Sequence, residues 1–303
     1  MLRIGLIGCG EWGRKILGAL QYFGHQVVVH DIDPDLDLPS LDQSSIISSW
    51  TEYEALTLDG HIIATPATTH LKILDKLLSD QVPIFIEKPL AMSYLEVQHL
   101  EELRRDDIFM MHIWKYHAGI VALKDLIASG VIGSLKSIRS KRCNWTSPRQ
   151  DIDSVWNLMP HDLSIIDCLL GDLPDPYFAV VEEYNSIPRS MIAVLGTDPF
   201  CHIEVSNRHW TKSREVRIHG TNGVAVLKDE VTDHLLVYLG DDSTSAGEST
   251  VKKMTFDYSH SALELEIESF CKYLKGGPPP LSDLKEGIRI TKYIESLRKL
   301  AQD

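Results

Sequence analysis

A glycine-rich turn near the N-terminus has the residue types and spacing of a dinucleotide-binding loop. Gly8, Gly10 and Gly13 form the pattern G-x-G-x-x-G after an apolar run, with Glu11 and Trp12 inside the pattern. The first glycine permits a tight turn, the second lets the backbone approach a pyrophosphate, and the third lets a helix pack closely on a strand. Unpaired N–H groups at the start of that helix would face the phosphates. Other Rossmann proteins, which bind different nucleotides or methyl donors, use similar turns, so this pattern alone does not settle the cofactor.

An acidic residue follows the next apolar run at the distance expected of a ribose-binding carboxylate. Asp31 comes directly after Gln26–His30 and 23 residues beyond the first glycine, close to the roughly 20-residue offset of dinucleotide-binding folds. A carboxylate here repels a 2′-phosphate, so Asp31 favours NAD over NADP. Because further aspartates follow at positions 33, 35 and 37, an ordinary acidic turn is the alternative.

A polar segment with a histidine follows the apolar run at 61–64. In open parallel sheets, ligands bind at the carboxyl ends of the strands. Thr65, Pro66 and His70 stand at such an end, and we expect them to contact the cofactor. The alternative is a plain turn in which Thr69 caps the next helix.

Glu87, Lys88 and Pro89 form an E-K-P motif at the end of another apolar run. A lysine beside a nicotinamide ring can hold a substrate hydroxyl and stabilise the negative charge that develops as its proton leaves. Glu87 would lie beside the same cofactor, and Pro89 is a candidate for a cis peptide bond. Read in isolation, a lysine at a strand end is a solvated charge.

Taken in order, these motifs resemble the Gfo/Idh/MocA oxidoreductases, named for glucose–fructose oxidoreductase, inositol dehydrogenase and a rhizopine catabolism protein. The resemblance extends to the turn at 129–133 and to the segment Trp156–Asp162, which is similar to the family's second catalytic motif. It implies that Lys88 contacts the reacting hydroxyl and that His161 takes or returns the hydroxyl proton. A histidine titrates near neutral pH, which suits proton transfer in both directions.

One position departs from the family pattern. Asn157 stands four residues before His161, where the family has an aspartate. On a helix, positions four apart face each other, so Asn157 could orient the imidazole but could not place a negative charge beside it. Asp162 could partly compensate. Without the family pattern, His161 would be read as a histidine at a helix N-terminus in a domain interface.

Further polar residues could line the substrate cleft. His112 and His117 flank Trp114 and are expected to be cleft-lining residues without a chemical role. Four residues before the second motif could recognise a phosphate or carboxylate, or could be ordinary surface residues: Arg142, Asn144, Trp145 and Arg149.

Two patterns of elements must position these residues. In the first third, strands alternate with helices, which predicts a parallel sheet covered on both faces, an α/β Rossmann domain. The expected strands are 2–7, 26–30, 61–64, 83–86 and 108–114, and the expected helices are 12–22, 69–78 and 93–105. The second half predicts an α+β domain with an open, mostly antiparallel sheet between residues 177 and 258, with helices at 118–129, 158–170, 261–274 and 283–300. The predicted domains are 1–118 and 119–303, with the C-terminal helices able to pack back on the first.

Bulk properties limit the partners and the compartment. The chain has 303 residues and a formal net charge of −13. An acidic surface repels phosphate backbones and anionic lipid, so neither nucleic acid nor a membrane is an expected partner. No signal peptide is evident, and the five scattered cysteines lack zinc-site spacing. We therefore expect a cytoplasmic protein with reduced thiols and no metal.

The sequence thus predicts an NAD-dependent oxidoreductase that transfers a hydride between nicotinamide and a hydroxyl of a sugar, polyol or nucleotide-sugar. The alternatives are an NAD-dependent glycoside hydrolase of the same family and a dinucleotide-binding regulator without catalysis. Retention of both Lys88 and His161 argues against the regulator, which needs no proton-transfer pair. The broad second sheet resembles the family's oligomerisation surface and implies a homodimer or homotetramer.

Overall fold

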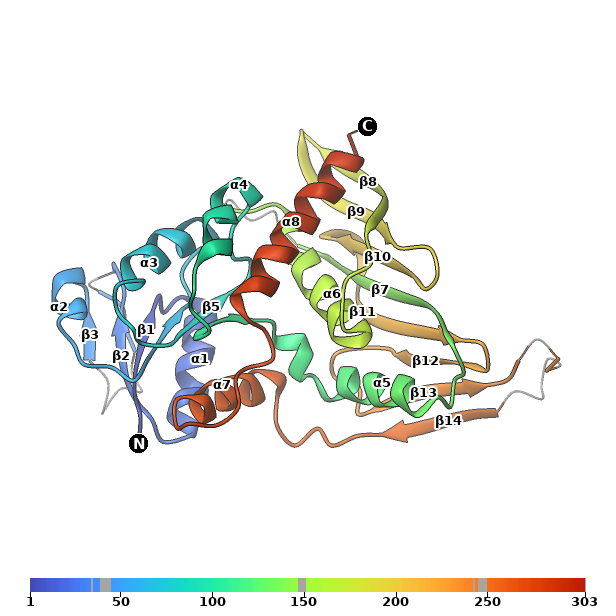
Figure 1. The fold of residues 1–303 in the computed structure, drawn as a ribbon, viewed down its shortest axis with the longest axis horizontal. Helices are drawn as coiled ribbons and strands as arrows, with labels where there is room; N and C mark the ends of the chain where they lie inside the picture. The colour runs from blue at the N-terminus through green and yellow to red at the C-terminus, as the bar shows by residue number, and fades with distance from the viewer. Residues whose placement is uncertain (34, 39–44, 147–150, 242, 245–249, 303) are drawn as a thin grey trace. The chain divides into compact units, whose positions relative to one another are not determined.

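The computed structural model describes residues 1–33, 35–38, 45–146, 151–241, 243–244 and 250–302 (Figure 1). The chain forms two compact units, the first made of Met1–His112 with Leu263–Thr291 and the second of Ile113–Ala262 with Lys292–Asp303. These units do not coincide with the predicted domains, whose boundary at residue 118 stays a prediction.

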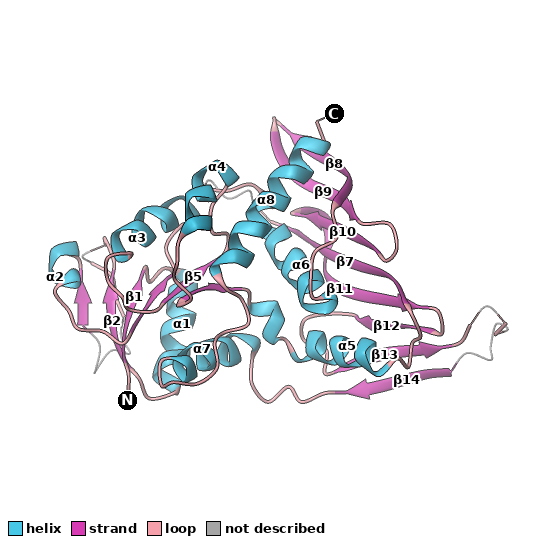
Figure 2. Ribbon diagram, in the orientation of Figure 1, coloured by secondary structure: helices cyan, strands magenta, loops and turns pink. Residues whose placement is uncertain are grey.

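The first unit is built on a six-stranded parallel sheet, as the alternating pattern predicts (Figure 2). The strand order is β3-β2-β1-β4-β5-β6. The strands are β1 (Arg3–Ile7), β2 (Gln26–His30), β3 (Ser45–Ile47), β4 (Gly60–Ile63), β5 (Ile84–Glu87) and β6 (Ile108–Met111). The four residues of β4, β5 and β6 are all buried, which explains their continuous apolar runs.

Helices cover both faces of this sheet. Helices α1 (Glu11–Tyr22) and α7 (Ala262–Tyr273) pack with Phe85 and Phe109 in one apolar cluster. The other face carries α2 (Trp50–Glu54), α3 (His70–Leu77), α4 (Tyr94–Val97), η2 (Gln98–Glu102) and the first part of α8 (Leu284–Leu300). The short η1 (Ala67–Thr69) precedes α3. Both faces of the parallel strands are therefore buried, and ligands can approach the sheet only at its edges and ends.

Two predicted elements of the first unit differ from the structure. The predicted helix 93–105 is a short α4 followed by the 3₁₀ segment η2, in which the buried residues Val97 and Leu100 are spaced by three, the period of a 3₁₀-helix. The strand predicted to reach Trp114 ends at Met111, and η3 (Ile113–Tyr116) follows. The short β3 and α2 were not predicted.

The second unit holds an eight-stranded sheet in the order β14-β13-β12-β11-β7-β10-β9-β8. All neighbours are antiparallel except β10 and β7, which confirms the predicted mostly antiparallel sheet. The strands are β7 (Leu135–Trp145), β8 (Pro176–Tyr184), β9 (Ile187–Leu195), β10 (Phe200–Ser206), β11 (Arg208–Gly220), β12 (Gly223–Leu227), β13 (His234–Leu239) and β14 (Thr250–Thr255).

Helices α5 (Ala118–Ser129) and α6 (Ser154–Leu170) pack on one face of this sheet. The fully buried Ile138, Ile203 and Ile218 belong to that face. On the opposite face, alternate residues such as Phe178 and Val180 are 52% and 46% exposed, so the described helices leave it open.

Helix α6 begins earlier than the sequence predicts. Asp153 is its N-cap, and the carboxylate accepts hydrogen bonds from the backbone N–H groups of Val155 (2.9 Å) and Trp156 (3.1 Å). The predicted start is residue 158, four residues too late, and Pro160 lies inside the helix. His161 therefore stands in the middle of α6, and its interpretation as a residue at a helix N-terminus is wrong.

Candidate active site

The glycine turn between β1 and α1 has open space at the point where a bound ligand is expected to contact the protein backbone. Gly8 has φ +87°, a conformation that favours glycine. A Cβ at Gly13 would lie 2.2 Å from the carbonyl oxygen of Gly8, so helix and turn touch at this point. A Cβ at Gly10 would meet nothing within 4 Å. Gly10 is the N-cap of α1 and no side chain caps that end, which leaves the helix N-terminus available to phosphate.

Asp31 and Trp12 complete this end of the sheet. Asp31 Oδ2 accepts a hydrogen bond from the backbone N–H of Cys9 at 2.7 Å, and Oδ1 accepts one from the N–H of Asp33 at 3.0 Å. The carboxylate thus also holds the glycine turn in place. The buried Nε1 of Trp12 has no hydrogen-bond partner among the described residues. An orphaned donor and the open space at Gly10 fit a dinucleotide bound along this turn.

His70 joins the two polar loops that follow β4 and β5. Its Nδ1 lies 2.8 Å from the carbonyl oxygen of Pro89, and its Nε2 lies 2.9 Å from that of Thr65. The imidazole is 1% exposed, so it acts as an internal tie between the Thr65-Pro66 loop and the E-K-P motif. The Lys88–Pro89 peptide bond is cis. Glu87 is buried, and Lys88 follows it at the carboxyl end of β5.

The second motif forms the accessible stripe of α6. Between Ser154 and Asp167, every residue of the helix is buried except Asn157 and His161, which are half-buried. These two residues are four positions apart on a regular helix and so lie on one face, one turn from each other. Lys88 belongs to the first compact unit and His161 to the second, so the pairing of the two stays a prediction.

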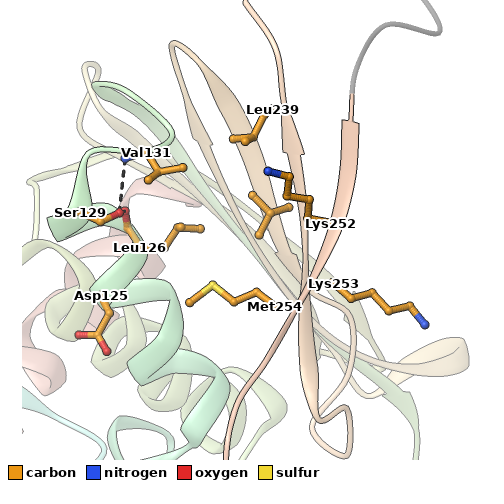
Figure 3. Close-up of a pocket in the computed structure, with 9 residues that line it drawn as sticks. Asp125, Leu126, Ser129, Val131, Leu239, Lys252, Lys253 and Met254 are labelled. Carbon is orange, nitrogen blue, oxygen red and sulfur yellow. Dashed lines mark hydrogen bonds between the residues drawn. The ribbon is translucent and has the colours of Figure 1, made fainter.

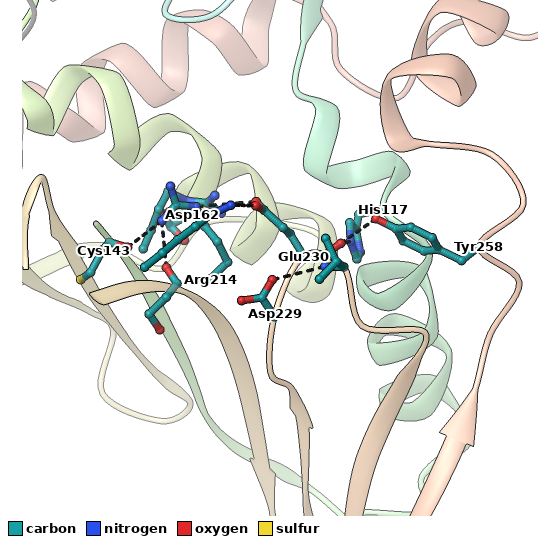
Figure 4. Close-up of polar contacts among 11 residues, drawn as sticks. His117, Cys143, Asp162, Arg214, Asp229, Glu230 and Tyr258 are labelled. Carbon is teal, nitrogen blue, oxygen red and sulfur yellow. Dashed lines mark hydrogen bonds and ion pairs between the residues drawn. The ribbon is translucent and has the colours of Figure 1, made fainter. Parts of the chain in front are cut away.

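Asp162 holds α6 on the sheet (Figure 4). Its Oδ2 accepts from Nε of Arg142 at 2.8 Å, and its Oδ1 accepts from the hydroxyl of Ser140. Asp162 is fully buried, and the guanidinium of Arg142 also stacks over Trp114 at 4.3 Å. Both carboxylate oxygens serve this packing, so Asp162 is not placed to compensate for Asn157.

The suggestion that Arg142 recognises a substrate anion is wrong, because the side chain is 3% exposed and paired with Asp162. Asn144 is half-buried and Trp145 is 66% exposed. Arg149 lies outside the described residues.

The two histidines around Trp114 are structural. His112 is 1% exposed, with Nδ1 2.8 Å from a carboxylate oxygen of Glu286. His117 caps α5 by accepting from the N–H of Gly119 at Nδ1, while Nε2 donates to the carbonyl oxygen of Glu230 at 2.9 Å. Since one nitrogen accepts and the other donates, the ring is neutral, and burial accordingly lowers the pKa of His117. Neither histidine is free to line a cleft.

Several polar residues of the second unit were not anticipated from the sequence. Lys115 and Asp167 form a buried ion pair at 2.9 Å. Glu230 approaches Lys212 and Arg214, and Tyr258 donates to its carbonyl oxygen at 2.6 Å (Figure 4). Their partners are distant along the chain, so no local motif marks them.

A groove of about 510 Å³ lies between the end of α5 and the last two strands (Figure 3). It is lined by Asp125, Leu126, Ser129, Val131, Val237, Leu239, Lys252, Lys253 and Met254. None of the predicted site residues lines it, so this groove is separate from the candidate site.

Among the described residues, no group of three His, Cys, Asp or Glu side chains could hold a metal ion. In the same part of the chain, no helix is long and apolar enough to cross a membrane. The five cysteines all lie among the described residues, and no disulfide bond joins any of them.

The chain matches two profiles of one family. Residues 2–111 match the oxidoreductase family with an NAD-binding Rossmann fold, and residues 120–226 match the Gfo/Idh/MocA C-terminal domain. Together these matches cover more than half of the chain, so the protein belongs to the Gfo/Idh/MocA oxidoreductase family, as its motifs predict. NAD is accordingly its cofactor.

The relatives that match over the full chain are distant. UDP-N-acetylglucosamine 3-dehydrogenase from Acidithiobacillus ferrooxidans is 24% identical over 95% of this chain and 94% of its own length. Its solved structure has a TM-score of 0.81 at 22% identity, covering 99% of this chain and 98% of that chain. Levoglucosan dehydrogenase in complex with NADH has a TM-score of 0.84 at 16% identity, covering 99% and 97%. Structural likeness at these identities shows the fold alone.

Two further relatives match over only part of their length. The 2,7-anhydro-N-acetylneuraminate hydratase of Escherichia coli (strain K12) is 24% identical over 58% of this chain and 51% of its own length. The hydratase of Mediterraneibacter gnavus is matched over 47% of its length. The chain thus spans about half the length of these curated relatives.

Two glycine variants should separate folding from cofactor binding. Gly13→Ala is expected to lower the melting temperature of the free protein, because its Cβ meets the Gly8 carbonyl oxygen at 2.2 Å. Gly10→Ala should melt like the wild type but bind NAD about tenfold or more weakly, since its Cβ occupies the space beside the helix N-terminus. Thermal melts and NAD titration measure both. Wild-type NAD affinity in Gly10→Ala would show that the pyrophosphate does not approach this turn.

Proposed function

We propose that the chain is an NAD-dependent dehydrogenase acting on one hydroxyl-bearing carbon of a sugar, polyol or nucleotide-linked sugar. The observation that carries the proposal is the accessible stripe of α6, where the only half-buried residues between Ser154 and Asp167 are Asn157 and His161. These residues occupy the two positions of the family's second motif. The dehydrogenase names of the full-length relatives support the same substrate class.

The cofactor would be held by the carboxyl ends of β1, β2, β4 and β5. The backbone of Gly8, Gly10, Glu11, Trp12 and Gly13 takes the pyrophosphate, and the Asp31 carboxylate accepts from the ribose hydroxyls, which favours NAD over NADP. The loops with Thr65, Pro66, His70 and Glu87 frame the nicotinamide end. When bound, NAD supplies the hydride acceptor or donor.

Lys88 and His161 would handle the hydroxyl group. Lys88 donates a hydrogen bond to the reacting oxygen and stabilises the negative charge that develops on it. His161 accepts the hydroxyl proton in oxidation and returns it in reduction. Asn157, one turn earlier on the same face, orients the imidazole or a sugar hydroxyl without adding charge.

A redox-neutral reaction is the second candidate. The hydratase names of two relatives favour it, although those matches cover only about half of each protein. In such a reaction, as in an NAD-dependent glycoside hydrolase, the substrate is oxidised and then reduced again within one turnover. No NADH then accumulates.

A substrate screen tests the proposal. The purified chain is incubated with NAD⁺ and inositols, free sugars, or UDP- and dTDP-sugars, and NADH is followed by its absorbance. Net NADH formation with one of these groups is the expected result. Consumption of an anhydrosugar or glycoside without net NADH would favour the second candidate. NAD binding without conversion of any of these compounds would contradict the proposed substrate class and favour a dinucleotide-binding regulator.

The open face of the second sheet would join copies of the chain into a homodimer or homotetramer. Its partly exposed apolar residues include Phe178, Val180 and Ile192, and apolar residues gathered on one open face mark an interaction surface. Sedimentation equilibrium measures the assembly, and a monomer at micromolar concentration would contradict this assignment.

A further inference from the structure

Glu266 of α7 packs behind the E-K-P motif. Phe85 of β5 stacks on Phe270 of α7, with ring centroids 5.0 Å apart. Two residues further along β5 is Glu87, on the same face of the strand as Phe85. One turn before Phe270 on α7 is Glu266. Two strand residues and one helical turn span similar lengths, roughly 6–7 Å, so Glu87 and Glu266 face each other across this packing.

The carboxyl group of Glu266 is unusually placed. The residue is fully buried, and neither of its side-chain oxygens has a hydrogen-bond partner among the described residues. Its helix neighbours Ile267, Phe270 and Cys271 belong to the apolar cluster beneath the sheet. An ionised carboxylate in such surroundings is strongly disfavoured, so a proton on Glu266 is the physical expectation.

The charges around Glu266 also favour its protonated form. Burial first, and then the field of Glu87, raise the pKa of Glu266 well above its ordinary value. Across the cluster, α1 and β6 contribute apolar side chains such as Ile16 and Met111. Burial likewise raises the pKa of Cys9, a thiol of the same apolar cluster, to about 11. Among the described residues, Glu87 is thus the charged group that acts on Glu266.

We propose that Glu266 is held protonated beside the negatively charged Glu87 behind Lys88, and that Glu266 releases its proton when the positively charged nicotinamide ring binds. An added cation at the carboxyl end of β5 favours ionisation of a nearby carboxyl group. The proton passes from the Glu266 carboxyl to buffer, and no bond of the cofactor changes. By linkage, NAD⁺ then binds more tightly as the pH rises, whereas NADH, whose reduced nicotinamide ring is uncharged, does not. The inference rests on the proposed function in one respect, the nicotinamide position beside Lys88.

Calorimetric titration without substrate tests the proposal. The wild type is titrated with NAD⁺ and with NADH in buffers of different ionisation enthalpy, which gives the protons released on binding. We expect more proton release with NAD⁺ than with NADH, up to one per site, and loss of the difference in Glu266→Gln. Glu268→Gln is the matched control, since Glu268 lies on the same helix but pairs with Lys272 near the surface. Equal release with both cofactors in the wild type would overturn the proposal while leaving the dehydrogenase function intact, whereas failure to bind NAD⁺ would overturn both.

The stability of the cofactor-free protein gives a second measurement. Glu266 has a raised pKa in the folded state, so its proton stabilises the fold at low pH and this contribution is lost as the pH rises above the ordinary glutamate value. Relative to Glu266→Gln, the wild-type folding equilibrium constant should fall by about tenfold per pH unit until the folded-state pKa is reached. A stability difference that does not change between pH 5 and 8 would show that Glu266 is ionised in the fold.

Discussion

Lys88→Ala is expected to remove most hydride transfer while NAD remains bound. The side chain stands at the carboxyl end of β5, beside the cis peptide bond to Pro89 and the loop that His70 ties in place. Its proposed contact is with the reacting hydroxyl, not with the cofactor phosphates. Loss of one charge-stabilising or proton-handling group lowers rates by about 10²–10⁴-fold. We expect that loss in kcat/KM, with the Kd for NAD changed by less than about threefold.

The measurement is a pair of assays on the same preparation, initial-rate kinetics and NAD titration. Lys136→Ala is the matched control, because Lys136 is an exposed lysine that pairs with Asp198. Its kcat/KM should equal that of the wild type. If Lys88→Ala keeps wild-type kcat/KM, Lys88 does not contact the reacting group. If NAD binding falls as much as activity does, the lysine holds the cofactor instead.

Asp162→Ala is expected to have the largest effect on stability. The variant leaves the guanidinium of Arg142 buried without its carboxylate, and the hydroxyl of Ser140 also loses its acceptor. Removing one partner of a buried ion pair costs about 3–5 kcal/mol, mainly because the remaining charge is uncompensated. Urea denaturation followed by circular dichroism measures the loss.

A double variant distinguishes the effect of breaking the Asp162–Arg142 ion pair from the effect of losing side-chain volume. Replacing both partners, as Asp162→Leu with Arg142→Met, removes the uncompensated charge and should recover part of the stability lost in Asp162→Ala. The exposed pair of Lys136 and Asp198 is the control, since breaking it should cost no more than about 1 kcal/mol. A cost of Asp162→Ala as small as that of the exposed pair would contradict the buried arrangement.

Local sequence signals were sufficient to predict much of the fold and the glycine-rich turn. The helix predicted at 118–129 has those bounds in the structure, because Gly130 adopts the left-handed conformation (φ +69°) that ends helices. The glycine turn has the predicted open approach at Gly10. The strand prediction failed after Met111, where an apolar run continues but the backbone turns into η3. Periodicity cannot distinguish a strand from a turn within a short apolar run.

The pairings that define the interior could not be read from the sequence. His112 and Glu286 are 174 residues apart, and no local pattern links them. Glu266 stands in the stretch L-E-L-E-I-E, where alternate glutamates look alike, and only the packing of α7 on β5 buries it. For α6 a usable signal existed, since Asp153 is a good N-cap residue.

Transfer of a labelled hydride tests the central claim most directly. A substrate found in the screen is deuterated at the carbon that bears the reacting hydroxyl and incubated with the wild type and NAD⁺. The NADH formed is then analysed by mass spectrometry. For the proposed dehydrogenase we expect NADH that carries one deuterium. The rate of NADH formation should be equal to or lower than the rate with the unlabelled substrate. Unlabelled NADH, or product without any NADH, would contradict direct hydride transfer from that carbon as the net reaction.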